Sequence, residues 1–135
     1  MNLYYTLLLA AMLTLSTNTQ AFQPKVEIVE QFDDLKMIAF IDKKDIDHGP
    51  EWSPNTNEPP LSVGQAIQAV QHFLKTSNAS DKVEEIELRP LPKQANRWHY
   101  LIKIANQAMK AKHNIYVVLM SGKVIPAMIE PQSYK

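Results

Sequence analysis

Apolar and polar positions follow two different periods along this chain, and the change of period divides it into a helical and a β-stranded part. In Leu61–Lys75 the apolar side chains recur every three to four positions, at Val63, Ala66, Ile67, Val70, Phe73 and Leu74. Glutamines occupy the opposite side of the same stretch, at positions 65, 68 and 71. This period predicts an amphipathic helix that buries one stripe against a neighbouring layer.

The start of this helix carries a local signal. Ser62 can accept a hydrogen bond from the Gln65 amide, and the Gln65 side chain can reach back to the Ser62 amide, as in a capping box. Leu61 is placed to pack against Ala66. The sequence therefore predicts a helix that begins directly after Ser62 and ends before Thr76.

After the helix the period changes to two residues, which is typical of β-strands. The stretches that follow this period are Val83–Leu88, Arg97–Ile104, Ile115–Met120 and Lys123–Ile129. Gly122 separates the last two and can adopt the positive φ of a tight hairpin turn. We expect three or four antiparallel strands that follow one another as a meander.

Two of these strands also indicate their place in the sheet. Ile115–Met120 is apolar on both faces, as in a central strand that is covered on both sides. Pro126 lacks a ladder donor, so Lys123–Ile129 is expected at an edge or a bulge. One helix covers only one face of the sheet. The other face needs a second cover, for which the N-terminal segment and a second molecule are the candidates.

The residues that precede the helix are less regular. Lys25–Glu30 alternates as a short strand with one wet face. Leu35–Ile41 is a dense apolar run that fits either a second strand or a helical turn. In Asp42–Pro60, prolines at positions 50, 54, 59 and 60 predict a segment without helix or central strand. A loop of this length in a compact domain is either functional or disordered.

The fold class expected from this order is α+β, with one helix packed on a small antiparallel sheet. Residues 22–60 supply N-terminal strands and the proline-rich loop, and residues 61–135 supply the helix and the meander. We expect residues 22–135 to form one compact domain.

Residues 1–21 differ from the rest because they hold no charged side chain. Their apolar run Leu7–Leu15 is followed by Thr19 and Ala21 at the spacing that a signal peptidase reads, which predicts a secretory signal peptide cleaved near Ala21. The protein is then secreted or periplasmic. It has no membrane span after cleavage, because no other run approaches the about 20 apolar residues that a span requires. The missing lysine or arginine leaves an uncleaved N-terminal anchor as the alternative.

Composition narrows the classes of function. The chain has no cysteine, so no disulfide holds it together and its stability comes from packing. The formal net charge is zero, but acidic residues dominate up to Asp81 and basic residues dominate from Lys82 onward. The basic residues are scattered rather than clustered, and an exported chain meets little nucleic acid. We therefore expect the two halves to pack against each other, and no nucleic-acid partner.

The most polar stretch is Asp45–Trp52, with the sequence DIDHGPEW. Its residues Asp45, Asp47, His48 and Trp52 form a candidate partner-binding loop. The plainer alternative is that Trp52 anchors the loop through its ring and leaves the indole N–H in water. Both interpretations stay open at the level of the sequence.

The same stretch carries side chains of the types used for metal binding and for hydrolysis. A calcium loop of the EF-hand type is excluded, because proline occupies the position that needs glycine. A transition-metal site with Asp45, Asp47 and His48 lacks a second histidine nearby. Hydrolysis through Asp45, His48 and Glu51 requires a buried pocket that shifts their pKa values, of which the sequence gives no sign. We assign no catalytic, cofactor-binding or metal-binding residue.

The other histidines and aromatic residues carry weaker signals. His72, His99 and His113 have no neighbour at ligand spacing, so each is expected at the surface or half-buried. Trp98 and Tyr100 share one strand face with isoleucines, which favours a core position over a stacking platform. No nucleophile motif or phosphate-binding loop occurs in the sequence.

Three stretches together resemble a known family. LSVGQAIQAVQHFL, RWHYLIKI and IYVVLMSGKVI, which lie within residues 61–129, are similar to a PepSY-like domain, in which a short helix precedes a meander with a Gly turn. The resemblance rests on patterned apolar positions and on the turn Gly122-Lys123-Val124. It implies an exported bacterial module of a kind proposed, in some members, to bind or inhibit peptidases. It implies no set of catalytic residues.

The expected function is an exported, non-enzymatic binding or regulatory module without a cofactor. Its partner is an envelope protein or peptide, a peptidase included, received by strand addition along Lys123–Ile129. One alternative is a structural envelope protein that dimerises through an uncovered sheet face. Another is a small metal-dependent hydrolase that uses Asp45–Glu51. The sequence leaves the ligand and the oligomeric state open.

Overall fold

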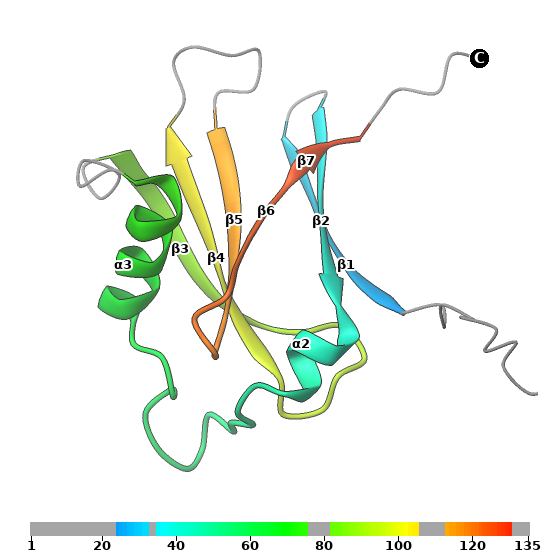
Figure 1. Ribbon diagram of the computed structural model, residues 1–135, viewed down its shortest axis with the longest axis vertical. Helices are drawn as coiled ribbons and strands as arrows, with labels where there is room; N and C mark the ends of the chain where they lie inside the picture. Colours follow the sequence, from blue (N-terminus) through cyan, green and yellow to red (C-terminus); the bar gives the residue numbers. More distant parts are fainter. Residues whose placement is uncertain (1–23, 33–34, 76–81, 106–112, 131–135) are drawn as a thin grey trace, which may run out of the picture.

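The computed structural model describes residues 24–32, 35–75, 82–105 and 113–130. These residues form a mixed α+β fold of two antiparallel sheets and two helices, shown in Figure 1. The expectation of one helix on one sheet is therefore incomplete, because a second sheet and a second, short helix are present. The predicted signal peptide at residues 1–21 lies outside the described residues.

One sheet contains four strands in sequence order, as expected for a meander. The strands are β3 (Val83–Pro90), β4 (Trp98–Ala105), β5 (His113–Leu119) and β6 (Val124–Pro126). All neighbouring pairs run antiparallel. Gly122 lies between the last two strands with φ 90, a conformation that glycine adopts without steric cost. The predicted turn is confirmed.

The helix α3 (Val63–Leu74) covers one face of this sheet and packs chiefly against β4, β5 and β6. Its predicted capping box is present. Ser62 Oγ accepts from the Gln65 amide at 3.1 Å, and Gln65 Oε1 accepts from the Ser62 amide at 2.9 Å. Ala66 and Val70, on the apolar stripe, are buried against the sheet.

The second sheet covers the other face of the first. It consists of β1 (Lys25–Phe32), β2 (Leu35–Asp42) and β7 (Met128–Ile129), in the order β1-β2-β7. The segment Leu35–Ile41 is thus a strand and not a helical turn. Figure 1 shows α3, the sheet β3-β4-β5-β6 and the pair β1-β2 as three successive layers. The N-terminal segment supplies the second cover.

A single residue carries the chain from one sheet to the other. β6 ends at Pro126 and β7 begins at Met128, and the Ala127 amide between them donates to the Ile115 carbonyl at 2.9 Å. β6 is an edge strand of its sheet, so the position predicted from the missing Pro126 donor is confirmed. The crossing leaves β6 only three residues long.

Two apolar cores separate the three layers. The core between the two sheets contains Ile28, Met37, Ala39, Ile41, Ile46, Leu91, Leu101, Ile115, Val117 and Leu119. The core between α3 and its sheet contains Ala66, Val70, Tyr100, Ile102, Ile104, Tyr116, Val118 and Met120. Alternate residues of β5 enter opposite cores, which explains why this strand is apolar on both faces. Trp98 packs against the helix core and Tyr100 lies inside it, as predicted.

The first part of the proline-rich segment is helical, contrary to the expectation of a segment without helix. Helix α2 (Lys43–Asp47) ends before Pro50, so no proline ring interrupts its turn. Ile46 is buried in the core between the sheets, which holds this turn against the domain. Turns and bends follow it up to Ser62.

Neither sheet nor helix depends on a covalent crosslink, because the chain has no cysteine. Among the described residues, no helix is long and apolar enough to cross a membrane.

Candidate functional site

The predicted loop Asp45–Trp52 places its polar side chains against different partners. The Asp45 carboxylate forms an ion pair with Lys123, with 2.5 Å between Oδ2 and Nζ, and the Asp47 carboxylate pairs with Lys43 at 2.7 Å. The hydrogen bond from Lys43 lowers the pKa of Asp47. His48 is exposed at the end of α2. These side chains do not converge on a common point.

Trp52 is buried, with 8% of its surface exposed. Its ring packs edge-to-face against Trp98, with centroids 5.3 Å apart and an interplanar angle of 80°. The predicted anchoring role of Trp52 is confirmed. The prediction that its N–H stays in water is wrong, because Nε1 donates to the Asn57 carbonyl at 2.9 Å. A backbone acceptor in the same loop replaces the water.

Arg97 fixes the loop from below. Its guanidinium donates to the Gly49 carbonyl and, at 3.4 Å each, to the Asp47 carbonyl and the Glu51 carboxylate. The cavity beneath the loop, lined in part by Leu91, measures only about 10 Å³. Such a space holds one water at most. Recognition of a partner by the outer surface of the loop stays a prediction.

No metal-binding cluster occurs within the described ranges, since no three histidine or carboxylate side chains gather there at ligand spacing.

A different surface combines open backbone with an apolar groove, along β3. In the part of the chain that the structure describes, β3 pairs only with β4, so the other side of its backbone has no strand partner. Helix α3 packs chiefly over β4, β5 and β6 and leaves the β3 side of the same face less covered. An eight-residue strand edge therefore borders an incompletely covered sheet face.

The groove between α3 and β3 has a volume of about 440 Å³. It is lined by Glu58, Pro59, Ser62, Val63, Ile86, Leu88 and Tyr100. Ile86 and Leu88 form an apolar floor from β3, and Val63 projects from the first turn of α3 with 48% of its surface exposed. The groove is open to solvent and mostly apolar, so it offers contact area for side chains of a ligand.

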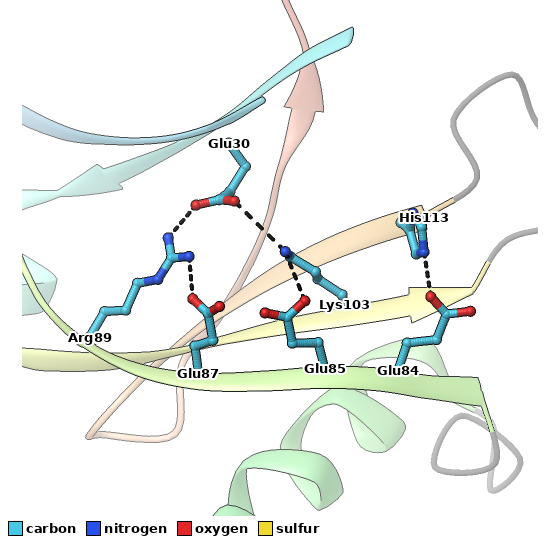
Figure 2. A network of polar contacts seen from close by, with 7 residues as sticks. All are labelled: Glu30, Glu84, Glu85, Glu87, Arg89, Lys103 and His113. Carbon is cyan, nitrogen blue, oxygen red and sulfur yellow. Dashed lines mark hydrogen bonds and ion pairs between the residues drawn. The ribbon is translucent and has the colours of Figure 1, made fainter. Parts of the chain in front are cut away.

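The opposite face of β3 is charged. Figure 2 shows its side chains meeting Glu30, which reaches across from β1. Arg89 forms ion pairs with Glu30 and Glu87. Lys103 of β4 lies 3.0 Å from Glu85 and 3.9 Å from Glu30. We give the name acidic row to these side chains: Glu30, Glu84, Glu85, Glu87, Arg89, Lys103 and His113.

Glu84 joins the acidic row because β3 is irregular at its start. The register with β4 shifts between Val83 and Glu85, so Glu84 is an extra residue in the ladder. Its carboxylate contacts the His113 ring of β5 (Figure 2). Lys103 Nζ donates a hydrogen bond to the Glu85 carboxylate at 3.0 Å. Four carboxylates in this row face two permanent cations and one histidine (Figure 2).

His99 lies next to this row and is the one predicted histidine position that the structure corrects. It was expected at the surface or half-buried, but only 1% of it is exposed. Neither ring nitrogen makes a hydrogen bond to another described residue. Burial first, and the positive charge of Arg89 second, lower the pKa of His99 from 6.5 to about 4, although the Arg89 backbone carbonyl acts weakly in the opposite direction. The ring is therefore neutral at pH 7.

The sequence predicts strand addition along Lys123–Ile129 and not along β3. The edge expected along Lys123–Ile129 is divided by the crossing at Ala127, which leaves short strands on either side. The alternation of Ile86 and Leu88 with Glu85 was visible in the sequence. Its meaning depends on the position of α3, which no local pattern encodes.

No protein-family model, curated protein or solved structure matches this chain.

Proposed function

We propose that this protein is an exported, non-enzymatic binding module that receives an extended segment of another envelope protein along β3. The observation that carries the proposal is the open edge of β3 beside an apolar groove of about 440 Å³. Backbone groups of the edge supply hydrogen bonds to an added strand, and the groove accepts its side chains. Together they provide affinity and selectivity without any reacting group.

The charged residues support binding rather than catalysis. Asp47 and Glu85 each accept a hydrogen bond from a lysine, which favours their charged form over proton exchange, and Asp45 is ion-paired with Lys123. His99 is buried away from any substrate. A metal-dependent hydrolase at Asp45–Glu51 is not favoured by this arrangement.

Export and family membership belong to the same proposal. We place the mature protein in the periplasm or outside the cell, on the strength of residues 1–21. The order of one long helix followed by a four-stranded meander supports the PepSY-like resemblance. A peptidase with an exposed extended segment is then one candidate partner.

A second candidate function is self-association through the outer face of the sheet β1-β2-β7. That face exposes apolar side chains: Val29 is 44% exposed and Met128 is 56% exposed. A shallow groove of about 320 Å³ on this face is lined by Ile38 and Phe40 between charged residues. Apolar surface of this kind marks many protein contacts. Sedimentation over a range of concentrations tests it, and a strictly monomeric protein would exclude it.

Site-specific photo-cross-linking tests the main proposal. A photoreactive amino acid at Val63 samples the groove, and the same residue at Gln68 samples the solvent side of the same helix. His48 and Phe40 report on the two competing surfaces. We expect an adduct with an envelope protein from position 63 and none from position 68. Adducts from position 48 or 40 alone, or none at all, would contradict the proposal.

A further inference from the structure

The two faces of β3 differ in chemistry, and this difference specifies what the added strand must look like. We infer that the segment bound along β3 alternates apolar and basic side chains, with the apolar set in the groove and the basic set beside the acidic row. The inference rests on the proposed function, since it names the class of partner for the same site.

The alternation follows from the register of β3 with β4. Ile86 and Leu88 stand opposite Ile102 and Tyr100, both of which belong to the helix core. Glu85 stands opposite Lys103, on the other face of the sheet. An added strand continues the same pleat, so its alternate side chains face the groove and the acidic row in turn.

The sign of the second set follows from the charges already present. The side chains of Glu84 and Glu85 remain 51% and 44% exposed although each has a partner. Arg89 is engaged on both sides by Glu30 and Glu87. The acidic row thus holds more carboxylates than permanent cations. Glu58 adds a further carboxylate at the groove. Lysine or arginine beside this row is favoured, and aspartate or glutamate is disfavoured.

The same charges argue against pairing of β3 with a second copy of itself. Two β3 edges side by side would place glutamates of both copies close together, which is a known device against edge-to-edge association. The edge therefore discriminates among strands rather than excluding all of them. Its regular part runs from Glu85 to Arg89, because the bulge precedes it and Pro90, which has no amide hydrogen, follows it.

Synthetic peptides test the inference on the mature, ¹⁵N-labelled protein. The probe is acetyl-KVKVKVK-amide, with acetyl-EVEVEVE-amide as the charge-reversed peptide and acetyl-KKKKVVV-amide as the isomer without alternation. We expect the probe to shift the β3 amide resonances and to bind at least about tenfold more tightly than either of the others, with affinity that falls as salt is added.

Amino-acid substitutions test separately the contribution of the acidic row and that of the apolar groove to peptide binding. The double substitution Glu85→Gln/Glu87→Gln should lower the affinity for the probe peptide about tenfold and reduce the salt dependence of its binding. Val63→Arg should lower the affinity because the longer side chain obstructs the groove. Glu27→Gln, on the exposed side of β1, is the matched control and should leave the affinity unchanged. Well-dispersed spectra of all variants confirm that each is folded.

The outcomes separate the inference from the proposed function. Equal binding of the acidic peptide at β3 would overturn the basic preference and leave β3 as a strand-accepting edge. Equal binding of the isomer would overturn the alternation. Binding of the probe without any change at β3, or no binding of any peptide, would overturn the inference altogether, and the cross-linking at position 63 then decides independently whether the groove binds a partner.

Discussion

Arg89 of β3 and Glu30 of β1 form an ion pair that joins the two sheets across 59 positions of sequence. Glu30 also faces Lys103 at 3.9 Å, so one carboxylate balances two cations at the boundary between the sheets. The pair fixes the position of the acidic row relative to the strand edge. Stability and recognition therefore share these residues.

Glu30→Gln should destabilise the protein by about 2 kcal/mol, because two cations lose a charged acceptor at a site where the Glu30 side chain is only 14% exposed. Chemical denaturation monitored by circular dichroism measures the change. Glu27→Gln, on the exposed side of the same strand, should cost less than about 0.5 kcal/mol. Equal losses in the two variants would show that the ion pair does not join the sheets.

Stability should fall in mildly acidic solution because of His99. Its folded-state pKa of about 4 lies below the ordinary value of 6.5, so the unfolded chain binds the additional proton first. The contribution of His99 to the free energy of unfolding is fully present above pH 6.5 and is lost as the pH falls toward 4. Between pH 7 and pH 4.5 the loss is about 2 kcal/mol. The positive charge of Arg89 also opposes protonation of the ring.

The variant His99→Leu isolates this contribution, since the carboxylates that also titrate in acid are common to both proteins. Urea denaturation at several pH values gives the two stability curves. As the pH falls from 7 to 4.5, the free energy of unfolding should decrease more in the wild-type protein than in the variant, by about 2 kcal/mol. Parallel curves would mean that His99 is accessible to protons in the folded state.

Trp52→Ala should destabilise the protein by about 3 kcal/mol, because it removes a buried indole and its contact with Trp98. Trp52→Phe should cost less, since the edge-to-face contact is partly retained. In a Trp98→Phe background, fluorescence of the remaining Trp52 should be blue-shifted relative to the unfolded chain. Emission at the wavelength of a solvent-exposed indole would refute its burial.

Ser62→Ala should cost about 1 kcal/mol, because the Gln65 amide loses its side-chain acceptor at the start of α3. Ser62→Asp replaces the hydroxyl with a carboxylate oxygen that can accept the same hydrogen bond, so this variant should retain most of the stability. Thermal denaturation of the two variants distinguishes the cap from other effects at this position. Ser62 also lines the groove, so fraying of the first helical turn in the alanine variant should lower the affinity for the probe peptide.

Features that depend on a few neighbouring residues could be predicted from the sequence. The capping box requires only Ser62 and Gln65, and the edge position of β6 requires only Pro126. The two-faced burial of β5 was visible because every position from Ile115 to Leu119 is apolar. In each case the physical cause lies within a span of one element.

Features that depend on distant contacts could not be predicted. The second sheet brings the N-terminal strands against β7, which no local pattern indicates. The burial of His99 was likewise not indicated by its polar side chain. Helix α2 forms because Ile46 finds a place in the core between the sheets. The alternation of β3 was readable, but its open edge and groove depend on where α3 packs.

Hydrogen exchange of individual β3 amides decides whether this strand receives another. With the alternating basic peptide bound, the amides of Glu85–Arg89 that do not bond to β4 should exchange at least about tenfold more slowly, while those already paired change little. Unchanged exchange along β3, with protection confined to Asp45–Trp52 or to the outer face of β1 and β2, would contradict the proposed site.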